Sequence, residues 1–306
     1  MADEPSDTLG RLGQTLTSGR NWDGGWGYCA GKASRLEPTC WGLLSELETG
    51  ASADDRVRAT VSLLAGWQRP DGLLGDIPGA PPNLAFNGLA ALVVRRLRVR
   101  RPAGLPDLRG LEMRLLENLS TAKGVAAGAN DALRQDNRLQ GWPWIADTFS
   151  WVEPTALCLL ALKKARPVFP DLPTGARVAE AESLLGDRCC VVGGWNYGNA
   201  NVLGRELHPY VPTTALGLLA LQDRRGLAAV QRSLRWLRDH GTSEASGAAL
   251  SLAAVAAQAY GEPPDALGTT LVAQAERTGF FGNLATTGMA VYAMTGSRHD
   301  MAAFTL

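Results

Sequence analysis

The sequence predicts an all-α fold, an (α/α)6 toroid or barrel of about twelve helices arranged as an inner and an outer ring. Three observations predict it. One sequence pattern recurs along the chain about every 50 residues on average. The recurring segments are apolar on all sides, and amphipathic segments alternate with them. No segment shows the period-two alternation of a strand. We therefore expect one toroid domain that spans residues 1–306.

The repeat is clearest in two segments that match at eight of twelve positions. Trp151–Leu162 reads WVEPTALCLLAL and Tyr210–Leu221 reads YVPTTALGLLAL. A third segment, Arg35–Glu46, reads RLEPTCWGLLSE and matches the first at five positions. Weaker copies begin near Ala85, Glu244 and Ala285. Each copy is expected to be a helix that other helices surround, because small and apolar residues run almost all round it.

The segments between these copies have the spacing of surface helices. In residues 225–240, Leu and Val recur every three or four positions while Arg occupies the other face. The expected outer helices are Asp7–Thr17, Asp54–Gln68, Pro106–Leu119, Thr174–Cys189, Arg225–His240 and Pro264–Thr278. An open α-solenoid is the alternative architecture, but its helix pairs need not alternate so sharply between buried and half-exposed.

Composition and charge exclude several classes of protein. The 30 Lys and Arg balance 30 Asp and Glu, so the chain has no global attraction for nucleic acid or anionic lipid. The five Cys form no C-x-x-C pair, and so few Cys in a chain of 306 residues argue against a disulfide scaffold. The first residues are acidic and polar, and no apolar run approaches 18 residues. We expect a cytoplasmic protein without a signal peptide.

Long connections rich in Gly and Trp precede the repeated helices, at 21–34, 123–150 and 191–210. Long loops in compact domains are usually functional or disordered, and Trp-rich segments do not suit disorder. All of them precede inner helices, so we expect them to gather at one end of the ring around a cleft. The candidate ligand-binding residues are Trp26, Tyr28, Asn87, Trp142, Trp144, Trp151, Trp195, Tyr197, His208 and Tyr210.

The motifs GGWGY, QRPDGLLGD, GWPW and GGWNYGN precede helices of this type, and together they resemble the prenyltransferase and squalene-cyclase repeat family. The family motif is a Gln followed by Gly-x-Trp at the end of an outer helix. Gln68 and Gly72 fit it, with Leu74 in place of Trp. The resemblance implies a six-plus-six helical barrel whose central cavity binds isoprenoid chains, and we expect no cofactor and no metal.

Class II terpene cyclases, which resemble this fold, protonate an alkene or epoxide with an Asp in a D-x-D-D-T-A motif that this chain lacks. Laying that motif on Glu153-Pro154-Thr155-Ala156 places Glu153 at the proton donor. Glu37 occupies the same position of its repeat, and Asp147 lies six residues before Glu153. An apolar cavity or a like-charged neighbour would hold such an acid protonated. The residues also fit a structural role, since an acid in a first turn complements the helix dipole.

We therefore expect an acid-initiated, terpene cyclase-like enzyme with Glu153 as donor and with Glu37 or Asp147 tuning it or steering water. A non-catalytic toroid that binds isoprenoid, lipid or a partner is the alternative. A protein prenyltransferase-like zinc site would draw on Asp187, Cys189 and His208, and a glycosidase-like enzyme would pair two of the carboxylates. The basic cluster 95–101 fits either a solvated helix end or an anionic partner. Peripheral membrane contact and the oligomeric state stay open.

Overall fold

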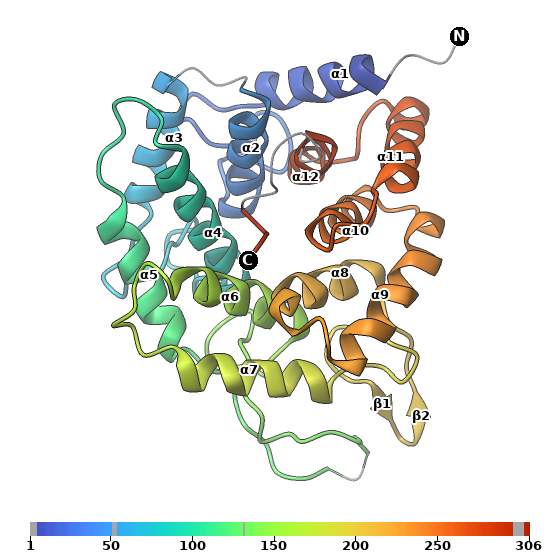
Figure 1. The fold of residues 1–306 in the computed structure, drawn as a ribbon. Helices are drawn as coiled ribbons and strands as arrows, with labels where there is room; N and C mark the ends of the chain where they lie inside the picture. The colour runs from blue at the N-terminus through green and yellow to red at the C-terminus, as the bar shows by residue number, and fades with distance from the viewer. Residues whose placement is uncertain (1–4, 51–53, 131, 296–302) are drawn as a thin grey trace.

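The computed structural model describes residues 5–50, 54–130, 132–295 and 303–306. Twelve α-helices in this part of the chain alternate between two rings (Figure 1). The inner helices are α2 (Leu36–Thr49), α4 (Leu84–Arg100), α6 (Val152–Ala165), α8 (Val211–Ala220), α10 (Gly247–Ala259) and α12 (Leu284–Thr295). The outer helices are α1 (Pro5–Ser18), α3 (Asp54–Gly66), α5 (Arg109–Thr121), α7 (Gly175–Asp187), α9 (Ala228–His240) and α11 (Asp265–Thr278).

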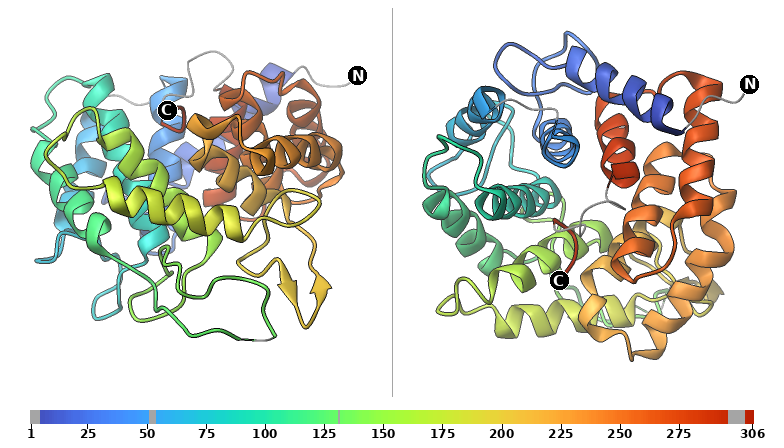
Figure 2. Two further views of the ribbon diagram at one scale, coloured as in Figure 1. Left: turned by 60° about the horizontal axis from the view of Figure 1, so that its bottom comes forward. Right: turned by 45° about the horizontal axis from the view of Figure 1, so that its top comes forward.

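The inner helices form a closed ring. Each packs against the next along the chain, and α12 packs against α2, as the right-hand view of Figure 2 shows. The outer helices cover this ring, with α3 on α2, α5 on α4 and so on to α11 on α10, while α1 lies over α12 and α2. The predicted α/α toroid is confirmed, and the open solenoid is excluded by the contact between α12 and α2.

The remaining elements are short and mostly lie in the connections. A two-residue hairpin pairs β1 (Asn201–Val202) with β2 (Arg205–Glu206) before α8. Two 3-10 turns, η1 (Gln222–Arg224) and η2 (Gly241–Ser243), flank α9. The observed helix ends differ from the predicted ones by a few residues. The largest shifts include the start of α9, because the chain first makes η1 and then a turn.

Three buried tryptophans join the outer ring to the inner ring. The indole Nε1 of Trp26 donates to the Leu16 carbonyl oxygen at 2.8 Å, at the end of α1. Trp142 and Trp195 donate likewise at 2.9 and 2.7 Å, to the Leu119 and Leu185 carbonyls near the ends of α5 and α7. All three side chains are fully buried. The Gly-Trp motif is therefore a hydrogen-bonded wedge between the inner ring and each of these three outer helices, α1, α5 and α7.

A side chain of the adjacent inner helix forms a hydrogen bond with the backbone of each buried Trp. The hydroxyls of Thr39, Thr155 and Thr214 accept the backbone N–H of Trp26, Trp142 and Trp195 at 3.0, 2.9 and 3.0 Å. In the second repeat, Asn87 replaces Thr and Leu74 replaces Trp. The Asn87 amide accepts from Leu74 N at 2.7 Å and donates to Leu74 O at 3.0 Å. The repeated Thr thus satisfies a buried loop backbone, which would otherwise cost free energy.

Neighbouring repeats cap one another at the end where the inner helices begin, which we call the mouth. The backbone N–H of Val152 at the start of α6 donates to the Tyr197 carbonyl oxygen of the next repeat at 3.0 Å. The Leu84 N–H at the start of α4 donates to the Trp144 carbonyl oxygen at 2.8 Å, and that of Leu284 in α12 to the Tyr28 carbonyl oxygen at 2.7 Å. These bonds satisfy donors that a helix cannot pair internally.

The first inner helix is capped by a side chain instead. Asp76 stands two residues after Leu74, as Tyr28 does after Trp26, and its Oδ2 accepts the Leu36 N–H at 2.7 Å. The same oxygen accepts from Arg35 Nε at 2.7 Å. A carboxylate at this place complements the helix dipole and fixes α2 relative to the second repeat.

The C-terminal residues close the opposite end of the ring, where Figure 1 shows the terminus on the axis. The buried Phe304 ring stacks on Trp41 of α2, with 5.4 Å between centroids, and meets Tyr292 of α12 edge-on at 5.6 Å. Gln222 Nε2 donates to the Phe304 carbonyl oxygen at 2.6 Å. Lys164 of α6 donates to the Thr305 carbonyl oxygen. Contacts with four elements make this segment the floor of the ring.

Three of the arginines in the basic cluster 95–101 form ion pairs with carboxylates of the same protein. Arg96 is buried and holds Glu48 through two hydrogen bonds of 2.7 and 2.9 Å. Arg95 and Arg98 both pair with Glu112 of α5. Paired charges of this kind present little free positive charge to a ligand. Within the described ranges, no helix has the length and apolar character needed to cross a membrane.

Candidate functional site

Two glutamates lie at the mouth, at equivalent positions of two inner helices. Glu37 is the second residue of α2 and Glu153 the second residue of α6, and both side chains are half-buried. The proline that follows each of them costs no helical hydrogen bond, because the first N–H groups of a helix have no partner within it. The repeat therefore places two carboxyl groups at the same depth in the ring.

Tyr28 fixes the first of these carboxyl groups. Its hydroxyl donates to Glu37 Oε2 at 2.6 Å. Burial raises the pKa of Glu37, and this hydrogen bond partly opposes the rise because it stabilises the ionised carboxylate. Burial and the neighbouring negative charge of Glu37 raise the pKa of Tyr28, so the phenol remains a donor. Tyr28 was predicted as a ligand contact, and the structure shows it orienting Glu37.

Glu153 has no such partner among the residues that the structure describes. Burial, first, and the negative charge of Glu37, second, raise the pKa of Glu153 to about 7. The two carboxyl groups are therefore close enough to repel each other when both are ionised. Near neutral pH, Glu37 is held by Tyr28 while Glu153 is divided between its protonated and ionised forms. Such a pair has one acid that is free to give up its proton.

Asp147 does not join this pair. It is exposed in the loop before α6, with a left-handed backbone at φ 62°. The causes that raise the pKa of Glu153 do not include its charge. The expectation that Asp147 tunes the donor is therefore not supported. Asp147 lies in a turn six residues before Glu153, and its side chain is in solvent. His208, another predicted site residue, is also exposed.

Apolar side chains form the layer beneath the two glutamates. The residue four positions further along an inner helix lies on the same face one turn deeper. In the six inner helices these residues are Trp41, Leu89, Leu157, Leu216, Leu252 and Met289, all 2–9% exposed. The contact of Trp41 with Phe304 confirms that this face of α2 points to the axis. Trp41 was missed from the sequence, although it stands four residues after Glu37.

Four predicted ligand contacts are corrected by their burial. Trp26, Trp142 and Trp195 lie between the rings, and Asn87 bonds the Leu74 backbone. Their indole or amide groups are used in structural hydrogen bonds, so they cannot line an open cleft. A glycine of the inner helix makes room for two of the indoles. A Cβ at Gly42 or Gly217 would come within 2.7 Å of Trp26 or Trp195.

The remaining predicted aromatic residues do lie at the mouth. Trp151, Tyr197 and Tyr210 are 39%, 51% and 48% exposed. The rings of Tyr197 and Tyr210 are neighbours, with centroids 5.3 Å apart. Trp144 is half-buried and meets Phe86 of α4 edge-on. Three of these rings, those of Trp151, Tyr197 and Tyr210, are therefore exposed to solvent at the mouth.

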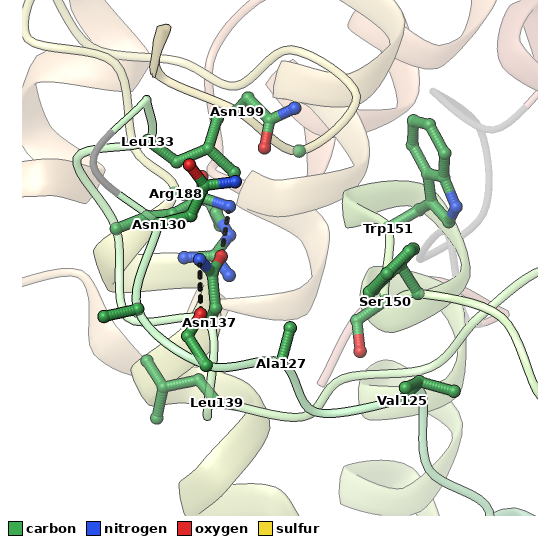
Figure 3. Close-up of a pocket in the computed structure, with 15 residues that line it drawn as sticks. Val125, Ala127, Asn130, Leu133, Asn137, Leu139, Ser150, Trp151, Arg188 and Asn199 are labelled. Carbon is green, nitrogen blue, oxygen red and sulfur yellow. Dashed lines mark hydrogen bonds between the residues drawn. The ribbon is translucent and has the colours of Figure 1, made fainter. Parts of the chain in front are cut away.

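A cavity of about 760 Å³ lies beside the mouth rather than on the ring axis. Its walls are loop residues within 125–130 and 133–139, the approach to α6 at 149–151, and residues 188 and 198–199 (Figure 3). The sequence predicted a cleft lined by aromatic side chains at the mouth, whereas Trp151 is the one predicted aromatic residue that lines this cavity. Asp187, which was considered as a zinc ligand, instead accepts hydrogen bonds from the Arg188 guanidinium and from the Asp136 N–H. The described residues contain no group of three or more His, Cys, Asp or Glu that could hold a metal.

Comparison with known proteins gives similarity in fold at low sequence identity. No family model and no curated sequence matches the chain. A variant of the type II terpene cyclase MstE from Scytonema, in complex with merosterolic acid A, superposes with a TM-score of 0.59 and 13% identity, over 96% of this chain and 97% of that chain. A protein from Actinoplanes superposes with a TM-score of 0.59 and 16% identity, over 98% and 100%.

The GH76 α-mannanase BT2949 of Bacteroides thetaiotaomicron also superposes, with a TM-score of 0.65 and 10% identity, over 97% of each chain. These similarities place the chain in the α/α toroid fold. That fold carries different activities, so function has to be argued from the residues at the mouth.

Proposed function

We propose that this protein is an acid-initiated, terpene cyclase-like enzyme that acts on an isoprenoid at the mouth of the ring. Glu153 is the proton donor. The observation that carries the proposal is the state of this carboxyl group. It is half-buried, has no hydrogen-bond partner in the described structure, and has its pKa raised to about 7. An acid whose pKa lies near the working pH is suited to proton transfer.

The proposed reaction begins with transfer of the Glu153 proton to one carbon of a substrate alkene. The alkene electron pair forms the new C–H bond, and positive charge develops on the other carbon. A second alkene of the chain closes a ring onto that cation, and the resulting cation returns a proton to the Glu153 carboxylate, so the product is an isomer of the substrate and the acid is restored. Glu37, anchored by Tyr28, places negative charge near the cation. The exposed aromatic rings of Trp151, Tyr197 and Tyr210 at the mouth would attract such a cation.

The layer below the carboxyl groups supports a hydrocarbon substrate. Its six residues are all apolar and offer no side-chain hydroxyl, amide or charge. Burying a sugar against such a layer would leave its hydroxyls unpaired, which costs free energy for each group. An isoprenoid chain has no such groups, and it would bury the exposed aromatic surface of Trp151, Tyr197 and Tyr210 at the mouth.

The test is turnover of isoprenoids by wild-type protein and by Glu153→Gln. Geranylgeraniol and geranylgeranyl dihydroxybenzoate are incubated with each protein, and products are identified by mass spectrometry. We expect an isomeric product from the wild type, a rate at least 100-fold lower with Glu153→Gln, and retained binding of the substrate. Absence of turnover together with tight binding would favour the non-catalytic binder. Equal rates with both proteins would overturn the role of Glu153.

A glycosidase-like enzyme is the second candidate, and one observation favours it. Glycosidases generally use two carboxyl groups, one of them with a raised pKa, and Glu37 and Glu153 form such a pair. GH76 mannanases are among the proteins of similar fold. Hydrolysis of α-1,6-mannotriose by the wild type but not by Glu153→Gln would establish this function in place of the first.

A further inference from the structure

We propose that the cavity beside the mouth is a separate binding site for a neutral, hydroxyl-rich group such as a sugar or polyol. The inference does not depend on the proposed reaction at Glu153, because the cavity has its own lining. Its volume of about 760 Å³ lies within the range of small-molecule sites. It is built from loop residues within 125–130 and 133–139, the approach to α6 and residues 198–199.

The chemistry of the lining points to hydroxyl groups. Four amide side chains line the cavity, those of Asn130, Gln135, Asn137 and Asn199. An amide offers both donors and an acceptor, and so does a hydroxyl group, so the two pair in either sense. Leu133, Leu139 and the aromatic rings of Phe149 and Trp151 supply apolar surface between them. Polar groups that alternate with apolar faces match a ligand that carries both hydroxyls and C–H surface.

The side chain of Gln135 has a buried oxygen with no hydrogen-bond partner among the described residues. Gln135 Nε2 donates to Asn137 Oδ1 at 2.9 Å. Its Oε1 is shielded from solvent and accepts no hydrogen bond from the described residues. A buried acceptor left unpaired costs free energy, about 1–3 kcal/mol. A ligand hydroxyl that donates to this oxygen would remove the cost on binding.

The charge of the cavity excludes ionic ligands as its natural occupants. Arg188 is the one charged residue among those that line it. Its guanidinium is buried, pairs with Asp187 and donates to the Asp136 carbonyl oxygen at 3.3 Å. That charge is neutralised within the protein, so it is not free to hold a phosphate or carboxylate. No carboxylate lines the cavity to hold an amine.

The loop is anchored on several sides, so the cavity is formed before a ligand arrives. Val125 N donates to the Thr148 carbonyl oxygen at 2.9 Å, and Leu203 N of the hairpin donates to the Ala132 carbonyl oxygen at 2.7 Å. Asp187 at the end of α7 accepts from the Asp136 N–H at 3.2 Å. A pre-formed site binds without the entropy cost of ordering a loop.

The test is direct binding, measured by calorimetry and saturation-transfer NMR with four probes. α-1,6-Mannotriose and maltotriose are neutral, while glucuronic acid and glucosamine carry a charge. We expect the neutral probes to bind wild-type protein and the charged probes to bind at least tenfold more weakly. Gln135→Leu, which replaces the unpaired oxygen by an apolar group of similar size, should weaken the neutral probes at least tenfold. Phe149→Ala should weaken them several-fold.

Two matched controls separate this site from the others. Trp22→Ala removes an indole that is 98% exposed and lies outside the cavity, and Glu153→Gln alters the mouth; both should bind the neutral probes as the wild type does. Thermal unfolding shows whether Gln135→Leu still folds. The inference is overturned if no neutral probe binds wild-type protein, if Gln135→Leu binds them equally, or if only Glu153→Gln abolishes binding. The result of this binding experiment does not depend on whether the protein turns over isoprenoids at Glu153.

Discussion

Burial, first, and the negative charge of Glu37 on α2, second, raise the pKa of Glu153 on α6, although the two residues lie 116 positions apart in the sequence. The toroid brings the two helices to the same mouth, and burial then makes their repulsion effective. Tyr28 stabilises the charge on Glu37, so the proton shared by the pair resides mainly on Glu153.

The stability of the protein should fall as pH rises between about 4.5 and about 7. The pKa of Glu153 is raised from its ordinary 4.5 to about 7 in the folded state. The folded state therefore binds more protons than the unfolded state in that window, and ionising Glu153 destabilises the fold. Glu153→Gln should gain about 1–3 kcal/mol of unfolding free energy near pH 8 and almost nothing near pH 4. Urea unfolding at both pH values measures this, and an equal effect at both would contradict it.

The rate of the proposed reaction should fall as pH rises through about 7, because the protonated form of Glu153 is the active one. Glu37→Gln removes the negative charge that raises this pKa, so the fall should move to lower pH. Initial rates from about pH 5 to about pH 9 would show both effects. A flat profile for the wild type would argue against acid initiation.

Removal of a wedge indole should cost far more stability than removal of an exposed one. Trp195→Ala leaves a large cavity and frees the Leu185 carbonyl oxygen, so we expect a loss of about 3–5 kcal/mol. Trp22→Ala serves as the matched control, since its side chain is 98% exposed, and it should change stability by less than about 0.5 kcal/mol. Chemical denaturation distinguishes the two; similar losses would mean that the wedge is not structural.

Loss of the Asp76 carboxylate, which caps α2, should lower the free energy of unfolding. Asp76→Ala removes the acceptor of both the Leu36 N–H and Arg35 Nε, and should cost about 1–2 kcal/mol. Asp76→Asn keeps an oxygen acceptor and should recover part of that loss. Thermal unfolding of the two variants gives the comparison. If the Asn variant were no better than Ala, charge rather than hydrogen bonding would carry the effect.

The architecture could be predicted from the sequence because each inner helix is apolar all round and recurs in register. Such segments have few ways to be buried other than inside a second layer of helices. The two glutamates were also predictable, because Glu37 and Glu153 stand at the same position of their repeats. Equivalent positions of a closed ring necessarily lie at the same depth.

The role of the tryptophans could not be predicted from the Gly-Trp motif by itself. Nothing in that motif says whether the indole faces the axis or the seam between the rings. The informative signal was further away, in the Thr that lies 13 residues after Trp26 and after Trp142 and bonds their backbone. The floor of the ring was unpredictable for another reason. Phe304 lies outside the repeats, and its stacking on Trp41 joins parts of the chain that share no pattern.

The most direct test of the account is the pKa of Glu153 itself. Protein labelled with ¹³C at the Glu side-chain carboxyl carbon is titrated by NMR, and Glu153→Gln identifies the resonance. We expect a midpoint of about 7 in the wild type and a lower one in Glu37→Gln. A wild-type midpoint near the ordinary 4.5, unchanged in Glu37→Gln, would show that Glu153 is a solvated surface acid and not the donor proposed here.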